Sequence, residues 1–77
     1  MNSNVNIFEL NRLSLKELLD LKSQLIERVL DMHELIKTIG DDMSIAILEE
    51  QIGEYVYRIG LINTIIQSKQ LANNMGV

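Results

Sequence analysis

Histidine and cysteine, the side chains most often used as bases, nucleophiles and metal ligands, are almost missing from this sequence. His33 is the single histidine among 77 residues, and there is no cysteine. Val29 and Lys37 stand four residues before and after it, and neither suits a metal site or a catalytic base. We therefore expect no metal, no cofactor and no catalytic site. We interpret His33 as a boundary residue of a packed helix, with a pH-sensitive interface contact as the alternative.

Carboxylates are the other candidates for chemistry, and they outnumber the basic residues. The 11 acidic and 7 basic residues give a net charge of −4. Four acids share one face of a predicted helix: Asp20, Glu27, Asp31 and Glu34. None stands on an apolar wall that would raise its pKa for acid catalysis, and such stripes are usually solvated. Recognition of a basic partner or mimicry of nucleic acid is the alternative. The chain is expected not to be an enzyme.

The elements that carry these residues are predicted to be helices, because apolar residues recur at three- and four-residue spacing and no proline interrupts them. Gly40, followed by Asp41 and Asp42, is the only strong internal break. We predict an all-α fold with helices over 15–39 and 42–71. The short connection makes the two helices antiparallel, so the unit is a helical hairpin within one domain.

The helix ends carry recognisable signals. Ser14 and Glu17 have the spacing of a capping box, and Leu13 and Leu18 that of a hydrophobic staple. Gly40 is expected to end this helix in a left-handed conformation. Asn6 and Glu9 repeat the capping pattern more weakly and predict a short helix over 7–12. We expect a flexible arm over 1–6 and a frayed tail over 72–77.

Each long helix has an apolar seam and a second strip beside it. The seam residues, at three- and four-residue spacing, are Leu18, Leu25, Val29, Met32, Ile36 and Ile39, then Ile45, Leu48, Ile52, Tyr55, Ile59, Ile62 and Ile66. Beside the first seam run Leu19, Ile26 and Leu30. Beside the second, Ala46, Gly53 and Gly60 follow at seven-residue spacing, which predicts close approach of another helix. Asn63 is expected within the second seam, where it would fix register and oligomeric state.

The second helix is apolar on nearly all sides between Tyr55 and Ile66, and a lone hairpin has too little surface to cover it. We therefore predict self-association into a dimeric four-helix bundle, or a tight complex with another protein. The predicted interface comprises Leu19, Ile26, Leu30, Ala46, Gly53, Tyr57, Gly60, Leu61, Asn63 and Ile65.

These patterns favour a non-catalytic protein–protein interaction module. The candidates are a small acidic regulator, an inhibitor of the kind that phages and plasmids encode, or a chaperone-like adaptor. One alternative is a nucleic-acid-binding four-helix dimer with a basic stripe of Arg12, Lys16 and Lys22. Another is a structural assembly subunit. The N-terminus lacks the charge and apolar run of a secretory signal, and no apolar stretch could span a bilayer, so we expect a soluble cytoplasmic protein.

Overall fold

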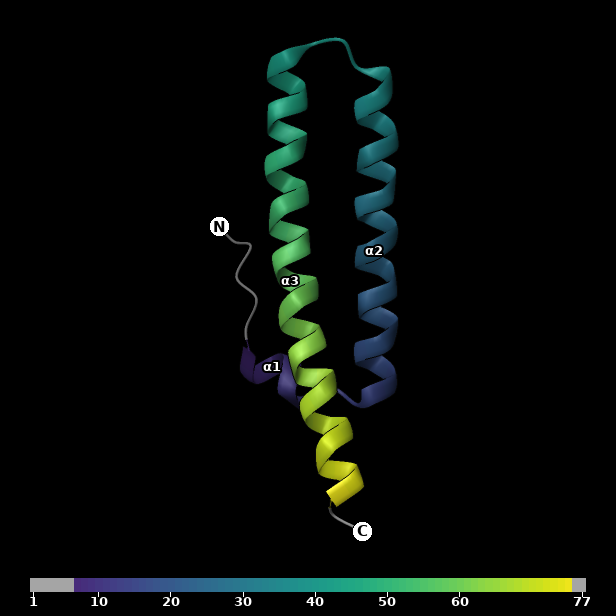
Figure 1. The fold of residues 1–77 in the computed structure, drawn as a ribbon, viewed down its shortest axis with the longest axis vertical. Coiled ribbons are helices and arrows are strands. Elements are labelled where there is room, and N and C mark those ends of the chain that lie inside the picture. The colour runs from purple at the N-terminus through teal and green to yellow at the C-terminus, as the bar shows by residue number, and fades with distance from the viewer. Residues whose placement is uncertain (1–6, 76–77) are drawn as a thin grey trace.

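The computed structural model describes residues 7–75 and arranges them as three helices (Figure 1). They are α1 (Ile7–Arg12), α2 (Leu15–Thr38) and α3 (Asp42–Met75). The two long helices run antiparallel side by side, and α1 lies near the N-terminal end of α2 (Figure 1). The predicted all-α helical hairpin is confirmed. The arm predicted over 1–6, and residues 76–77 of the predicted tail, lie outside the described residues.

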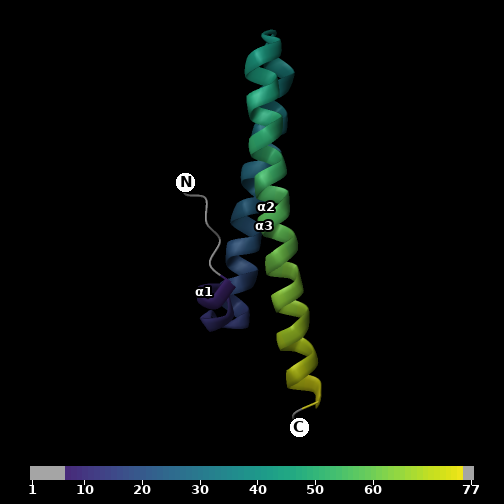
Figure 2. The same cartoon turned by 90° about the vertical axis from the view of Figure 1, so that its left-hand side faces the viewer.

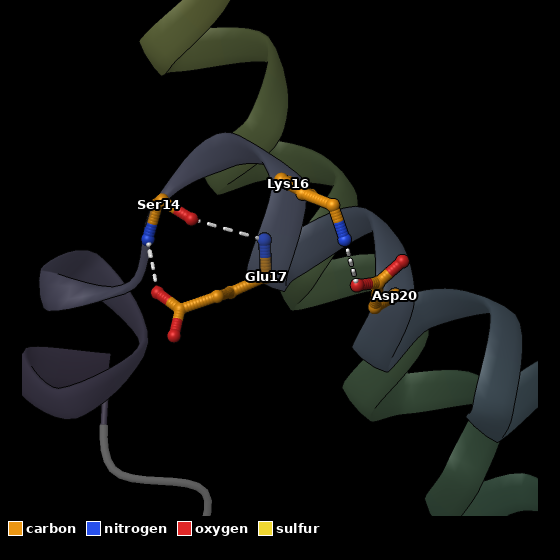
Figure 3. A network of polar contacts seen from close by, with 4 residues as sticks. All are labelled: Ser14, Lys16, Glu17 and Asp20. Carbon is orange, nitrogen blue, oxygen red and sulfur yellow. Dashed lines mark hydrogen bonds and ion pairs between the residues drawn. The ribbon is translucent and has the colours of Figure 1, made fainter.

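The start of α2 is fixed by a reciprocal capping box (Figure 3). The Glu17 backbone N–H donates to Ser14 Oγ at 3.1 Å, and the Ser14 N–H donates to Glu17 Oε1 at 2.9 Å. Both N–H groups belong to the set that an α-helix leaves without an intrahelical acceptor. The predicted cap is therefore present, and it holds the α1–α2 corner in place.

Ser14→Ala removes the side-chain acceptor of this capping box. We expect the free energy of unfolding to fall by about 1 kcal/mol, the usual effect of losing a serine N-cap. Urea titration followed by circular dichroism measures it. Ser23→Ala is the control, because Ser23 is exposed within α2, and an equal loss in both variants would contradict the role of the cap.

The turn between α2 and α3 differs from the prediction at Gly40. No described glycine has a positive φ, so the left-handed ending expected at Gly40 is wrong. The helix ends one residue early instead, at Thr38, because Ile39 adopts an extended conformation (φ −95°, ψ 132°). Its N–H still donates to the Ile36 carbonyl at 3.3 Å. A β-branched residue tolerates this extended backbone well, so no glycine is needed to stop the helix.

Asp41 caps the start of α3. Its Oδ2 accepts from the Ser44 N–H at 3.0 Å and from the Ser44 hydroxyl at 2.6 Å. The side-chain hydrogen bond from Ser44, followed by the backbone one, lowers the pKa of Asp41 below its ordinary value of 3.8. The ionised carboxylate is therefore the form that the folded helix favours.

A pH dependence follows from the lowered pKa of Asp41. The folded-state pKa lies below the unfolded one, so the cap stabilises the fold above pH 3.8 and loses this effect as the pH falls through the folded value. Asp41→Ala is expected to lower the Tm at neutral pH, with a difference from wild type that narrows in acid. Thermal melts between about pH 2.5 and pH 7 measure this, and a constant difference would contradict it.

α3 continues to Met75, four residues beyond the predicted end at Leu71. The tail expected to fray from Ala72 is thus helical up to Met75. No proline or glycine stands among residues 72–75, so nothing in the chain breaks the backbone hydrogen bonding there. This end of α3 extends past the start of α2, as Figure 1 shows.

The core lies where all three helices meet. Leu18 and Ile62 are almost fully buried, and Leu10, Ile65 and Ile66 complete the cluster. Leu13 packs against the same cluster that contains Leu18, as a hydrophobic staple requires. The Lys69 ammonium donates to the Asn11 carbonyl at 3.0 Å and ties α3 to the end of α1. All predicted seam residues are buried or half-buried.

Candidate interaction surface

α2 leaves a strip of large apolar side chains uncovered beside its seam. Leu19, Ile26 and Leu30 are exposed, with Leu30 at 58%. Each directly follows a seam residue: Leu18, Leu25 and Val29 respectively. A step of one residue turns 100° around a helix, so the whole strip lies about a quarter-turn from the seam on one side.

α3 has a matching strip built largely from small residues. Ala46, Gly53 and Gly60 are exposed, and a Cβ placed on either glycine would meet nothing within 4 Å. The close approach predicted for these glycines therefore involves none of the helices α1, α2 and α3 of the same chain. Val56, 53% exposed, lies between them. All four follow seam residues directly, as the strip on α2 does.

The hairpin brings the two strips onto one face. Two antiparallel helices that form a layer are related by a two-fold axis perpendicular to that layer. Rotation about this axis exchanges the two helices and does not exchange the two faces of the layer. Residues one step after the seam in α2 therefore share a face with residues one step after the seam in α3. We call this surface the open face; its apolar and small residues are Leu19, Ile26, Leu30, Ala46, Gly53, Val56 and Gly60. By the same rule, it also carries the polar residues His33, Lys37, Glu49 and Asn63.

The opposite face of the layer carries α1, which Figure 2 shows to one side of the long helices. Ile65 directly precedes the seam residue Ile66, so it leaves α3 on this opposite side. It is only 8% exposed and belongs to the cluster that contains Leu10 of α1. Leu61 lies on the same side and is half-buried. The short helix thus covers part of the apolar surface that appeared excessive for a hairpin.

Two further residues of the predicted interface are placed by the same rule. Tyr57 lies on the outer side of α3, away from α2, and is 67% exposed. Asn63 was expected within the seam, but it directly follows the seam residue Ile62 and is half-buried at the edge of the open face. Val56 was missing from the predicted set, although its position directly after Tyr55 was a sufficient signal.

The polar residues considered for chemistry lie exposed on the surface of α2. His33 and the four acids of the α2 stripe are exposed. Lys16 pairs with Asp20 at 3.0 Å (Figure 3), and Lys37 pairs with Glu34 at 3.3 Å. Lys16 and Lys22 stand six residues apart, which turns them to different sides of α2, so one hairpin does not align the proposed basic stripe. Residues 7–75 hold no His, Cys, Asp or Glu cluster of metal-site size.

Comparison with known proteins adds no assignment to these surfaces. No protein-family model, curated protein or solved structure matches this chain. Within the described part of the chain, no helix combines the length and apolar character that a membrane span requires. The open face is therefore interpreted from its own residues. Four of its large apolar side chains are exposed, while others, such as Phe8, Met43 and Leu71, are exposed elsewhere on the described residues.

Gly53→Ala tests whether the small residues of the open face have an intrachain role. Because nothing lies within 4 Å of the added Cβ, we expect the dilute chain to gain roughly 0.5–1 kcal/mol in the free energy of unfolding, from helix propensity alone. Denaturant titration at the lowest workable concentration measures the change. Destabilisation of the dilute chain would show that the glycine is required within the hairpin.

Proposed function

We propose that this chain is a non-catalytic protein–protein interaction module that binds helical protein surfaces, its own second copy included, through the open face. The observation that carries the proposal is the gathering of Leu19, Ile26, Leu30 and Val56, all exposed, on one side of the hairpin. Scattered exposed apolar residues are normal on a monomer, whereas a contiguous patch marks a contact surface.

The composition of the open face suits a helical partner. Ala46, Gly53 and Gly60 let a neighbouring backbone approach, while the leucine and isoleucine side chains of α2 supply apolar area beside them. An amphipathic helix in a partner would bury its apolar face against such a surface. Because the outer face of α2 is acidic, a partner with basic residues flanking its apolar face would fit best.

Such a module would act as a small acidic regulator, inhibitor or chaperone-like adaptor in the cytoplasm. Its biological effect would come from covering or joining protein surfaces, with no substrate turned over. The absence of cysteine suits a reducing compartment, since the chain needs no disulfide to hold its fold.

Sedimentation velocity tests the proposal on the unmodified chain. At micromolar concentration we expect a species of twice the 8.8 kDa monomer mass or larger, dissociating on dilution. Circular dichroism on the same samples confirms that the chain is folded. A folded monomer at every concentration would contradict the self-binding form of the proposal.

A further inference from the structure

We infer that two copies pack open face to open face with their turns at opposite ends. The inference rests on the proposed function, because it takes the open face to be the contact surface. Two closed arrangements bring two such faces together. In one the turns lie at the same end and α2 packs on α3 of the second copy; in the other the turns lie at opposite ends and each helix packs on its own counterpart.

The distribution of charge along the hairpin favours opposite ends. Residues 27–54, the half nearer the turn, hold eight acidic and two basic residues, a formal charge of −6. The remaining residues hold three acidic and five basic ones, a formal charge of +2. Turns at the same end would place the two acidic halves against each other. Turns at opposite ends place each acidic half beside a basic one, which is electrostatic complementarity between identical chains.

The open face is also self-complementary about one level of the hairpin. Gly53 and Gly60 have their midpoint between Val56 and Tyr57, and Leu19 and Leu30 have theirs between Gln24 and Leu25. Both midpoints lie about 16 residues from Gly40, so they stand at the same height in the two helices. A single two-fold axis at this height places Gly53 opposite Gly60 of the second copy, and Leu19 opposite Leu30.

Two polar residues of the open face match under the same axis. Glu49 and Asn63 directly follow the seam residues Leu48 and Ile62, and their midpoint is Val56. This midpoint lies half a residue from that of Gly53 and Gly60. The axis therefore sets the Asn63 amide of one copy within one residue, about 1.5 Å along the helix, of the level of the Glu49 carboxylate of the other. An amide N–H donating to a carboxylate is a charge-assisted hydrogen bond. Asn63 thereby acquires the register-setting role expected from the sequence, through a contact between chains.

The size of the face is adequate for a stable dimer. The 24 residues of α2, at about 1.5 Å rise per residue, run ~36 Å alongside α3. Two packed helices present a width of roughly 20 Å. The resulting ~700 Å² per copy approaches the ~800 Å² per partner of a standard stable interface.

A distance between identical spin labels separates the two arrangements. Because the chain has no cysteine of its own, Thr38→Cys places one label at the exposed end of α2, next to the turn. Thr38 lies about 13 residues from the inferred axis, so the two labels of a dimer should be ~40 Å apart. Turns at the same end would bring them within ~25 Å. Pulsed electron paramagnetic resonance on the full chain measures this distance.

A disulfide assay gives an independent readout near the axis. In a glutathione buffer, Val56→Cys should form an interchain disulfide, because the inferred axis passes next to Val56. Ser68→Cys should stay reduced in the same buffer, because Ser68 is exposed on the outer side of α3. With turns at the same end, the two Val56 positions would be too far apart for the ~7 Å Cα separation that a disulfide tolerates. The Ser68→Cys variant serves as the matched control for random collision.

The outcomes distinguish the inference from the proposed function. A ~40 Å distance with the Val56→Cys crosslink supports turns at opposite ends. A dimer with a short distance and no crosslink overturns this arrangement and leaves self-binding intact. If the chain sediments as a monomer and no distance between spin labels is detected, the open face does not bind a second copy, and both the inference and the self-binding form of the proposed function are overturned.

Discussion

Leu18→Ala is expected to lower the free energy of unfolding by about 3 kcal/mol, the usual effect of emptying a core leucine site. Leu18 is 0% exposed and lies in the cluster where all three helices meet. The truncation removes apolar contact and leaves a cavity that helices fixed by the capping box at Ser14 have little freedom to close. A domain of this size has only several kcal/mol of stability in total, so we expect a large fall in Tm. Denaturant titration followed by circular dichroism measures the change.

Leu35→Ala is the matched control for this core prediction. It removes the same atoms from the same helix, but Leu35 is 48% exposed, so we expect less than about 1 kcal/mol of destabilisation. If the free energy of unfolding fell equally in Leu18→Ala and Leu35→Ala, the core would not lie around Leu18. Ile62→Val provides a milder check, because it deletes one methylene from the other almost fully buried side chain.

Leu30→Glu is expected to raise the dissociation constant of the dimer by at least about 100-fold. Leu30 is exposed in the single chain, so the substitution should leave the helices folded. In the dimer its side chain would be covered by Leu19 of the second copy. A carboxylate there would lose water on dimerisation, and the apolar contact of Leu30 would be lost. A 100-fold change corresponds to about 2.8 kcal/mol, which lies in the range found when a central contact of an interface is removed.

Leu35→Glu controls for the added charge. It introduces the same residue into the same helix, but Leu35 precedes the seam residue Ile36 and so lies on the opposite face. Sedimentation equilibrium of both variants, with circular dichroism to verify folding, gives the two dissociation constants. If Leu35→Glu dissociates the dimer and Leu30→Glu leaves it intact, the dimer contact lies on the face opposite the open face, which contradicts the prediction.

Local signals explain why much of the fold could be predicted from the sequence. The start of α2 is specified by the spacing of four residues: Leu13, Ser14, Glu17 and Leu18. Because a helix cap depends only on residues within about one turn, it can be predicted without knowing the tertiary structure. The seam of α3 was equally predictable, since its three- and four-residue spacing runs unbroken from Ile45 to Ile66. Helical geometry alone then separates buried from exposed positions.

Features that depend on tertiary contact were harder to predict. Whether Ile65 is covered within the chain depends on where α1 packs, and a six-residue helix with weak signals does not specify that. The end of α2 was assigned to Gly40 because glycine often takes a left-handed conformation there. The turn instead uses an extended Ile39 followed by the Asp41 cap. Several local solutions close such a turn, and composition does not select among them.

The open face could be predicted only in part from the sequence. The sequence placed Leu19, Ile26 and Leu30 on one strip and Ala46, Gly53 and Gly60 on another, but it treated the two helices separately. Their union on one face follows only when both helices run antiparallel with their seams in contact. Val56 was overlooked because it belongs to neither strip by residue type, although its position after Tyr55 sets it among them.

Solvent accessibility of individual methyl groups shows whether a second copy covers the open face. The experiment uses methyl-labelled protein at a concentration where the dimer forms. A soluble paramagnetic agent should broaden the methyl NMR signals of the exposed Leu35 and leave those of the buried Leu18 sharp. These two residues give the reference values for exposed and buried methyl groups. We expect Leu30 and Val56 to be protected nearly as well as Leu18, since the second copy would cover them. Broadening of Leu30 and Val56 to the extent of Leu35, in a stably folded monomer, would contradict this expectation.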